Sequence, residues 1–370
     1  MKFTCEKNAL VSAVSVASRT VAQKSTIPAL EGIYIRAGVK LTLSGYNLET
    51  GITISVDAEI QQTGACIMPS RLFFDIIRKL PDDTVSISVD EKFKVSIRGG
   101  ISSFTITAMS SEDYPELPEV ESDKGISLPQ NELKAMIGGT SFAVSENQAR
   151  PIHTGCLFEV EDTSITVVAV DGYRLALRRW KSEEPIGRTL KFVVPAAALK
   201  EAEKILGDTD DPCTFFLGSK HILFTIGEAT LVCRLLEGEF LDWRRVLPQN
   251  QPVKLAVNVA KMTDSIERVG LIISEKLKSP VRCKFGENTA DFRSVSTIGE
   301  AHDVCQIAGD GQDMEIGFNC RYLLDALRAI PDAECSLELV NGLSPIVMNP
   351  CDGSGRYSYM VLPVRLKAGE

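Results

Sequence analysis

The strongest constraint on the fold is a helix pattern that occurs three times at nearly equal intervals. In residues 69–81, apolar side chains such as Leu72 and Ile76 fall on one helical face and charged side chains on the other. Pro69 and Pro81 mark its start and stop. The same pattern returns in residues 195–206 and 319–330, at offsets of 126 and 124 residues. Such regular self-similarity predicts three similar structural units.

A second kind of helix opens each third of the chain, and alternating strand-like runs follow it. The three helices are expected at residues 8–21, 130–145 and 259–274, and residues 85–89 and 104–107 are examples of the strands. Each third therefore reads as strand, helix and strands, twice over. This order predicts an α+β fold of six half-domain units, with helices covering one face of antiparallel sheets.

Two acidic, aromatic, proline-bearing segments separate the thirds. Residues 113–118 and 240–248 predict extended connectors, because proline interrupts both helices and central strands. We expect domains at residues 1–122, 123–250 and 251–370. Six similar units also suit a closed symmetric assembly, in which edge strands at the two chain ends pair with a second copy.

Composition excludes several classes of protein. The 370 residues are 44% hydrophobic, without an apolar run long enough for a bilayer or an evident secretory signal, so we expect a cytoplasmic protein with no membrane contact. The ten cysteines show no C-x-x-C spacing, and the three histidines are far apart in sequence. We therefore expect no metal and no cofactor.

The net charge of −9 is unevenly distributed. The six helical segments together carry +5, which leaves −14 on the rest of the chain. Helices that are basic relative to an acidic body suit a protein that surrounds DNA loosely and slides on it. Alternatively, short helices simply carry solvated Lys and Arg.

Signatures of catalysis are missing from the sequence. We find no phosphate-binding loop, no dinucleotide fingerprint and no nucleophile elbow, and the acidic cluster at 208–211 lacks the calcium-loop pattern. A binding scaffold is therefore expected rather than an enzyme. The alternative is an enzyme that uses Asp171 and Arg174 in a cleft between the second and third domains.

Three segments mix apolar side chains with arginine. In residues 170–175, the turn Asp171-Gly172 follows the apolar run 165–169 and displays Tyr173 and Arg174 at the end of a strand. Residues 240–248 and 359–366 have a similar composition. Taken alone, the first segment predicts only an ordinary hairpin corner.

Together with residues 314–319, these segments resemble the bacterial DNA polymerase III beta subunit, the sliding-clamp family, and the resemblance extends over the whole chain. It implies a non-catalytic, head-to-tail homodimeric ring around double-stranded DNA. A clamp loader complex would place it, and it would tether the DNA polymerase III alpha subunit, other polymerases and repair proteins. These partners would insert a short peptide rich in Gln, Leu and Phe between the second and third domains.

The resemblance also implies two sets of site residues. The partner-peptide groove would contain Gly172, Tyr173, Arg174, Leu175, Leu241, Arg245, Val246, Met360, Leu362, Pro363, Val364 and Arg365. The DNA-facing positions would be Lys24, Arg71, Arg78, Lys79, Arg150, Asn319 and Tyr322.

One segment departs from the family pattern. Arg150, Pro151, Ile152 and His153 stand where the family usually has arginine, two aromatic residues and an apolar residue. Two further hypotheses therefore remain open. The chain is either a divergent or secondary clamp, or a protein-recruitment ring that scarcely engages DNA.

Overall fold

The computed structural model describes residues 1–121, 124–273 and 279–366. The chain forms two compact units, Met1–Lys134 with Ala197–Leu235, and Ala135–Ala196 with Leu236–Glu370. The expected domain boundary at residue 122 and the expected helix end at Ser274 lie outside the described residues. Each unit is built on antiparallel sheets.

The first unit contains two sheets. A five-stranded sheet has the order β5 (Glu59–Gln62), β1 (Lys2–Glu6), β7 (Thr84–Val89), β8 (Lys94–Gly99) and β9 (Ser102–Thr107). An eight-stranded sheet has the order β10 (Ile126–Pro129), β15 (Pro212–Leu217), β16 (His221–Ile226), β17 (Ala229–Arg234), β4 (Thr50–Val56), β3 (Leu41–Tyr46), β2 (Gly32–Ala37) and β6 (Gly64–Pro69).

The second unit contains one sheet of ten strands. Its order is β14 (Leu190–Pro195), β11 (Gly155–Glu161), β12 (Ser164–Val170), β13 (Arg174–Lys181), β23 (Tyr357–Val361), β22 (Ile346–Pro350), β21 (Glu334–Leu339), β18 (Val253–Asn258), β20 (Gly299–Phe318) and β19 (Val281–Ser296).

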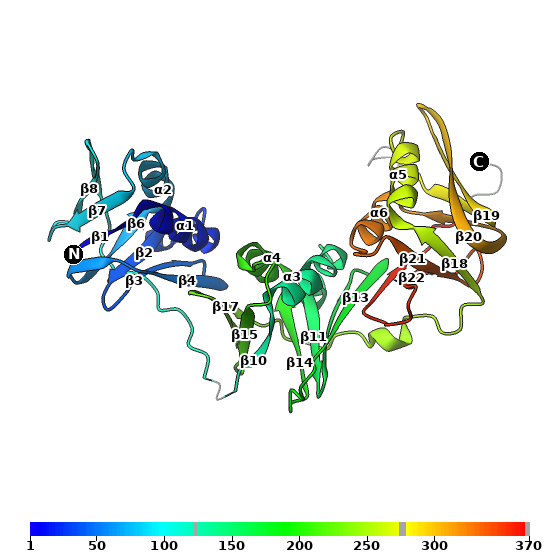
Figure 1. The fold of residues 1–370 in the computed structure, drawn as a ribbon, viewed down its shortest axis with the longest axis horizontal. Coiled ribbons are helices and arrows are strands. Elements are labelled where there is room, and N and C mark those ends of the chain that lie inside the picture. The colour runs from blue at the N-terminus through cyan, green and yellow to red at the C-terminus, as the bar shows by residue number, and fades with distance from the viewer. Residues whose placement is uncertain (122–123, 274–278, 367–370) are drawn as a thin grey trace. The chain divides into compact units, whose positions relative to one another are not determined.

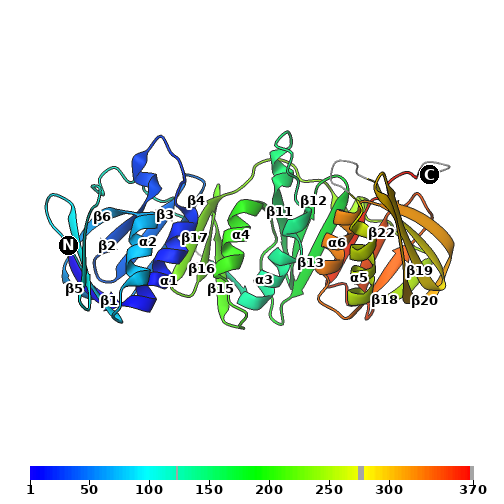
Figure 2. The ribbon, with the colours of Figure 1, turned by 90° about the horizontal axis from the view of Figure 1, so that it is seen from above.

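The described residues form six α-helices, and all six were expected from the sequence. They are α1 (Lys7–Ala17), α2 (Ser70–Lys79), α3 (Gln130–Gly138), α4 (Ala196–Ile205), α5 (Val259–Gly270) and α6 (Cys320–Arg328). The recurring order of strand, helix and strands is confirmed. In the first unit α1 and α2 lie side by side, and in the second unit so do α5 and α6 (Figures 1 and 2).

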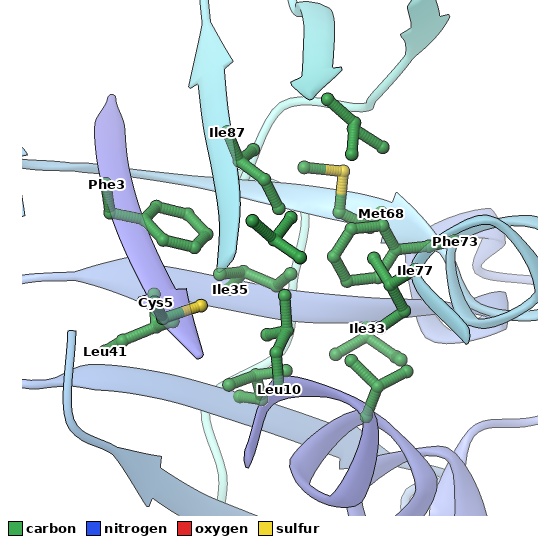
Figure 3. Close-up of a cluster of buried hydrophobic side chains, with 14 of the residues drawn as sticks. Phe3, Cys5, Leu10, Ile33, Ile35, Leu41, Met68, Phe73, Ile77 and Ile87 are labelled. Atoms are coloured by element: carbon green, nitrogen blue, oxygen red, sulfur yellow. The ribbon is translucent and has the colours of Figure 1, made fainter. Parts of the chain in front are cut away.

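The core of the first unit shows why the amphipathic pattern produces this arrangement. Phe73 and Ile77 of α2 and Leu10 of α1 point at side chains from both sheets, including Phe3, Ile35 and Ile87 (Figure 3). These side chains are almost completely removed from solvent. Burial of the apolar helix faces against two sheets is the main stabilising contribution to this unit.

Both large sheets join strands that are distant in sequence. In the first unit β17 pairs with β4, and Leu231 lies opposite Ile52. In the second unit β13 pairs with β23, and Leu175 lies opposite Met360. Green β13 therefore lies beside red β23 (Figure 1). This pairing brings the predicted hairpin corner next to the segment that nearly closes the chain.

Three of the six helices end earlier than the sequence predicted. The helix expected at 130–145 stops at Gly138, where Gly139 follows and Thr140 Oγ1 donates to the Met136 carbonyl at 2.7 Å. The helix expected at 8–21 continues beyond Ala17 only as a short 3-10 helix, Ser18–Thr20. The helix expected at 259–274 stops at Gly270.

The described residues contain no helix that is long and apolar enough to cross a membrane. None of the ten cysteines is paired in a disulfide, and most of them are buried. Within the same described ranges, no group of three or more His, Cys, Asp or Glu side chains could hold a metal ion.

Candidate functional site

The hairpin corner between β12 and β13 forms as its turn residues predict. Gly172 adopts a φ of +91°, which favours glycine. The Asp171 carboxylate accepts the backbone N–H groups of Tyr173 at 2.9 Å and Arg174 at 3.1 Å. This closed turn leaves the Tyr173 side chain 61% exposed. The hydrogen-bonded turn therefore holds the Tyr173 ring at the surface.

Arg174 is turned inward and is held by two carboxylates. It is 8% exposed, and its guanidinium donates to Asp171 Oδ2 at 2.9 Å and to Asp325 Oδ2 at 2.6 Å. The same group lies over the Tyr322 ring at 4.4 Å and faces the Phe142 ring at 5.5 Å. Its charge is thus compensated, and its main effect is to tie the hairpin corner to α6.

A pocket of about 720 Å³ opens beside this corner. Its walls include Gly172, Tyr173, Arg174 and Leu241 from the expected groove, and Arg150 and Tyr322 from the expected DNA-facing set. The remaining lining residues are Val144, Ser145, Glu146, Asn147, His153, Val170, Asp171 and Arg321. The structure therefore brings together residues that the sequence analysis had assigned to two different sites.

The other expected groove residues do not line this pocket. Leu175 and Met360 are buried in a core cluster with Val170 and Trp243, and Leu362 packs partly buried against that cluster. The Leu362 N–H donates to the Tyr173 carbonyl at 2.8 Å, so the chain end runs directly beside the corner. Pro363 is partly buried, and the side chains of Val246, Val364, Arg365 and Arg245 are exposed.

His153 lines the pocket from a short 3-10 helix, Pro151–Thr154. Its ring meets Phe240 edge-on, with centroids 5.0 Å apart and planes at 69°. Burial, and secondarily the charge of Arg150, lower the pKa of the imidazole below its ordinary 6.5. This shift favours the neutral form of the ring.

The remaining DNA-facing candidates are exposed cations or parts of a helix start. Lys24 follows the first helical segment, and Arg71, Arg78 and Lys79 project from α2. Arg78 is 3.3 Å from Asp75 and lies over the Phe74 ring. Asn319 caps α6, because its Oδ1 accepts the Tyr322 N–H at 3.3 Å.

Sequence reasoning missed two carboxylates that position these elements. Asp325 pairs with Arg174 from 151 residues away, and only its place on the polar face of a predicted helix gave a signal. Glu159 accepts the Trp243 indole N–H at 3.1 Å and an Arg244 N–H at 2.8 Å. A lone acidic residue in the apolar run 155–160 could have indicated it.

Comparison with known proteins gives the same family along the whole chain. Models of the DNA polymerase III beta subunit match three times, the N-terminal domain at residues 1–118, the central domain at 127–242 and the C-terminal domain at 244–365. A beta sliding clamp of Staphylococcus epidermidis is 32% identical, with 99% of each chain covered. One of Staphylococcus aureus is 31% identical over the same shares.

Solved structures agree. The DNA polymerase sliding clamp of Bacillus subtilis superposes with a TM-score of 0.94 at 30% identity, covering 99% of this chain and 100% of that chain. A putative DNA polymerase III beta subunit of Eubacterium rectale gives 0.93 at 32% identity over the same shares. With three matched domains and an equivalent fold, this chain belongs to the DNA polymerase III beta subunit family, the bacterial sliding clamps.

Proposed function

We propose that two copies of this chain form a head-to-tail ring that encircles double-stranded DNA, with three domains per copy at residues 1–122, 123–250 and 251–370. Full-length similarity to sliding clamps and the threefold helix repeat support this assembly. The exposed cations Lys24, Arg71, Arg78 and Lys79 supply positive charge for loose phosphate contacts. Members of this family are processivity factors rather than catalytic subunits, so the enzyme alternative is set aside.

We further propose that partner proteins bind by an extended peptide laid across the corner 171–174 and the chain end 360–365. The observation that carries this proposal is the pairing of β13 with β23, which runs Leu362 past Tyr173 beside the pocket. The partly or fully exposed side chains of Tyr173, Val246, Leu362 and Val364 supply apolar contact. Arg150 and Tyr322 belong to this site as well, because they line the same pocket.

The proposed partners follow from the family. They are the DNA polymerase III alpha subunit, the clamp loader complex, and other polymerases and repair proteins that carry clamp-binding peptides. These encounters would take place in the cytoplasm, where the chromosome is copied. Retention on circular DNA, with loss from linear DNA, would separate a working clamp from a recruitment ring that does not encircle DNA.

The placement of the groove is tested by changing Leu362→Ala together with Val364→Ala. Loss of two apolar side chains is expected to weaken binding of a partner peptide at least about tenfold. Fluorescence anisotropy with a labelled peptide measures the affinity, and light scattering checks that the mass is unchanged. Val39→Ala, an exposed valine on the β2–β3 turn, is the matched control. Unchanged affinity in the double variant would contradict this placement.

A further inference from the structure

His153 presents an incompletely satisfied ring at the pocket. Its Nδ1 is buried and has no hydrogen-bond partner. The backbone around it is fixed, because its N–H donates to the Arg150 carbonyl at 3.1 Å and its carbonyl accepts the Ser145 N–H at 2.8 Å. Edge-on contact with Phe240 holds the ring plane. Because Nδ1 is buried and His153 lines the pocket, the opposite side of the ring, which carries Nε2, is the side available to a ligand there.

The tautomer follows from the cost of burying a donor. A neutral imidazole carries one proton, on either Nδ1 or Nε2. A proton on Nδ1 would leave a buried N–H without an acceptor, and buried donors without acceptors are rarer in proteins than unpaired acceptors. A proton on Nε2 instead places the N–H at the pocket, where water or a ligand oxygen accepts it. The pocket thus contains one oriented donor.

We propose that His153 is a specificity-determining residue of the groove, whose Nε2–H selects partner peptides that place a carbonyl or carboxylate oxygen beside it. This inference rests on the proposed function, in which partners bind here as peptides. A peptide oxygen beside the Nε2–H accepts a hydrogen bond from it. An aliphatic peptide side chain at the same place displaces water from the Nε2–H and offers no hydrogen bond in return. A site that donates a hydrogen bond discriminates strongly against ligands that lack the acceptor.

The test uses the full-length protein and five-residue peptides built from Gln, Leu and Phe. In each series of peptides, one position is changed to Gln, Glu or Met, whose side chains have similar lengths, and the other positions are kept constant. At one position, Gln or Glu is expected to bind the wild type about tenfold more tightly than Met. The Gln and Glu arms distinguish an amide oxygen from a carboxylate oxygen, which the neighbouring Arg150 would favour.

Two variants test whether His153 causes this preference. His153→Leu is expected to abolish the preference for Gln or Glu over Met. It is also expected to raise the affinity for the Met peptide, because the variant has no imidazole N–H that would lose a hydrogen bond to water when the peptide binds. His221→Leu, a change in the other compact unit, is the matched control and should leave the preference intact. Equal binding of Gln, Glu and Met peptides to the wild type, or a preference that persists in His153→Leu, would overturn the inference but leave peptide binding in place.

A second measurement is independent of peptide and of variant stability. Long-range ¹H–¹⁵N spectra of the wild-type imidazoles report which ring nitrogen carries the proton. An Nε2–H signal is expected for His153, and an Nδ1–H signal would overturn the inference by itself. Failure of every peptide to bind would instead refute the proposed groove.

Discussion

At the scale of single residues, the contacts of Arg174 are internal. An arginine in a peptide-binding groove is expected to contact the peptide, whereas Arg174 contacts side chains of its own chain. A free guanidinium would orient a bound peptide, but this one is buried between Asp171 and Asp325 and covered by the Tyr322 ring. A buried charge keeps its place only while its partners remain. Arg174 therefore stabilises the pocket wall by joining the hairpin corner to α6.

The change Asp325→Asn tests this role. It removes one of the two carboxylates that compensate Arg174, and we expect the free energy of unfolding to fall by about 1–3 kcal/mol. Urea denaturation followed by circular dichroism measures the loss. Arg321→Gln is the matched control, because this exposed arginine is 3.9 Å from Asp325 and should matter by no more than about 0.5 kcal/mol. Equal losses in the two variants would argue against a special role for Arg174.

At the scale of elements, Glu159 fastens the connector between the second and third expected domains to the sheet through two side chains. The sequence predicted an extended connector, but Trp243–Arg245 forms a short 3-10 helix. Glu159 of β11 anchors it through the indole of Trp243 and the guanidinium of Arg244, and Lys191 of β14 lies 3.3 Å from the same carboxylate. Leu241, a pocket residue, lies just before this anchor.

Glu159→Ala is therefore expected to loosen the pocket as well as the connector. Loss of a nearly buried acceptor should lower the unfolding free energy by about 1–3 kcal/mol and weaken peptide binding. Glu159→Gln keeps an oxygen for the Trp243 indole and should recover most of the peptide affinity. Glu161→Ala, which removes an exposed carboxylate 3.4 Å from Arg244, is the control on the same strand. If Glu161→Ala weakens the peptide as much as Glu159→Ala, the anchor is not specific.

Helices were predictable because each buries one face, and this leaves a periodic pattern in the sequence. The ends of the helices were less predictable from the sequence. In α3, Gly138 and Gly139 fall inside an otherwise helical pattern, and local hydrogen bonds determine that the helix stops at Gly138. The hairpin corner was predictable from Asp171-Gly172, whereas its pairing with Asp325 depends on contacts 151 residues apart. Only the resemblance to a known family brought the corner and the chain end into one predicted site.

At the scale of the whole molecule, the expected domains share their sheets. The pairs β17–β4 and β13–β23 each continue a sheet from one third of the sequence into the next. Interior edges are thereby paired, while β9 ends the five-stranded sheet and β19 ends the ten-stranded one. Exposed apolar side chains lie near both of these edges. Near β9 they are Ile101 and Phe104. Near the other edge they are Val295 in β19, Ile298 in the turn that follows it, and Val304 in β20. Unpaired apolar edges favour association with another chain.

We propose that β9 of one copy pairs with β19 of the other, which makes two equivalent contacts per ring. Light scattering of the wild type should then give a mass near twice 40.4 kDa over a range of concentrations. Phe104→Glu places a charge in this contact and should shift the mass toward one chain. Val39→Glu adds the same charge to an exposed turn between β2 and β3 and should leave the mass unchanged. A wild-type protein that is monomeric at micromolar concentration would retain this fold, but it could not hold itself on DNA without help.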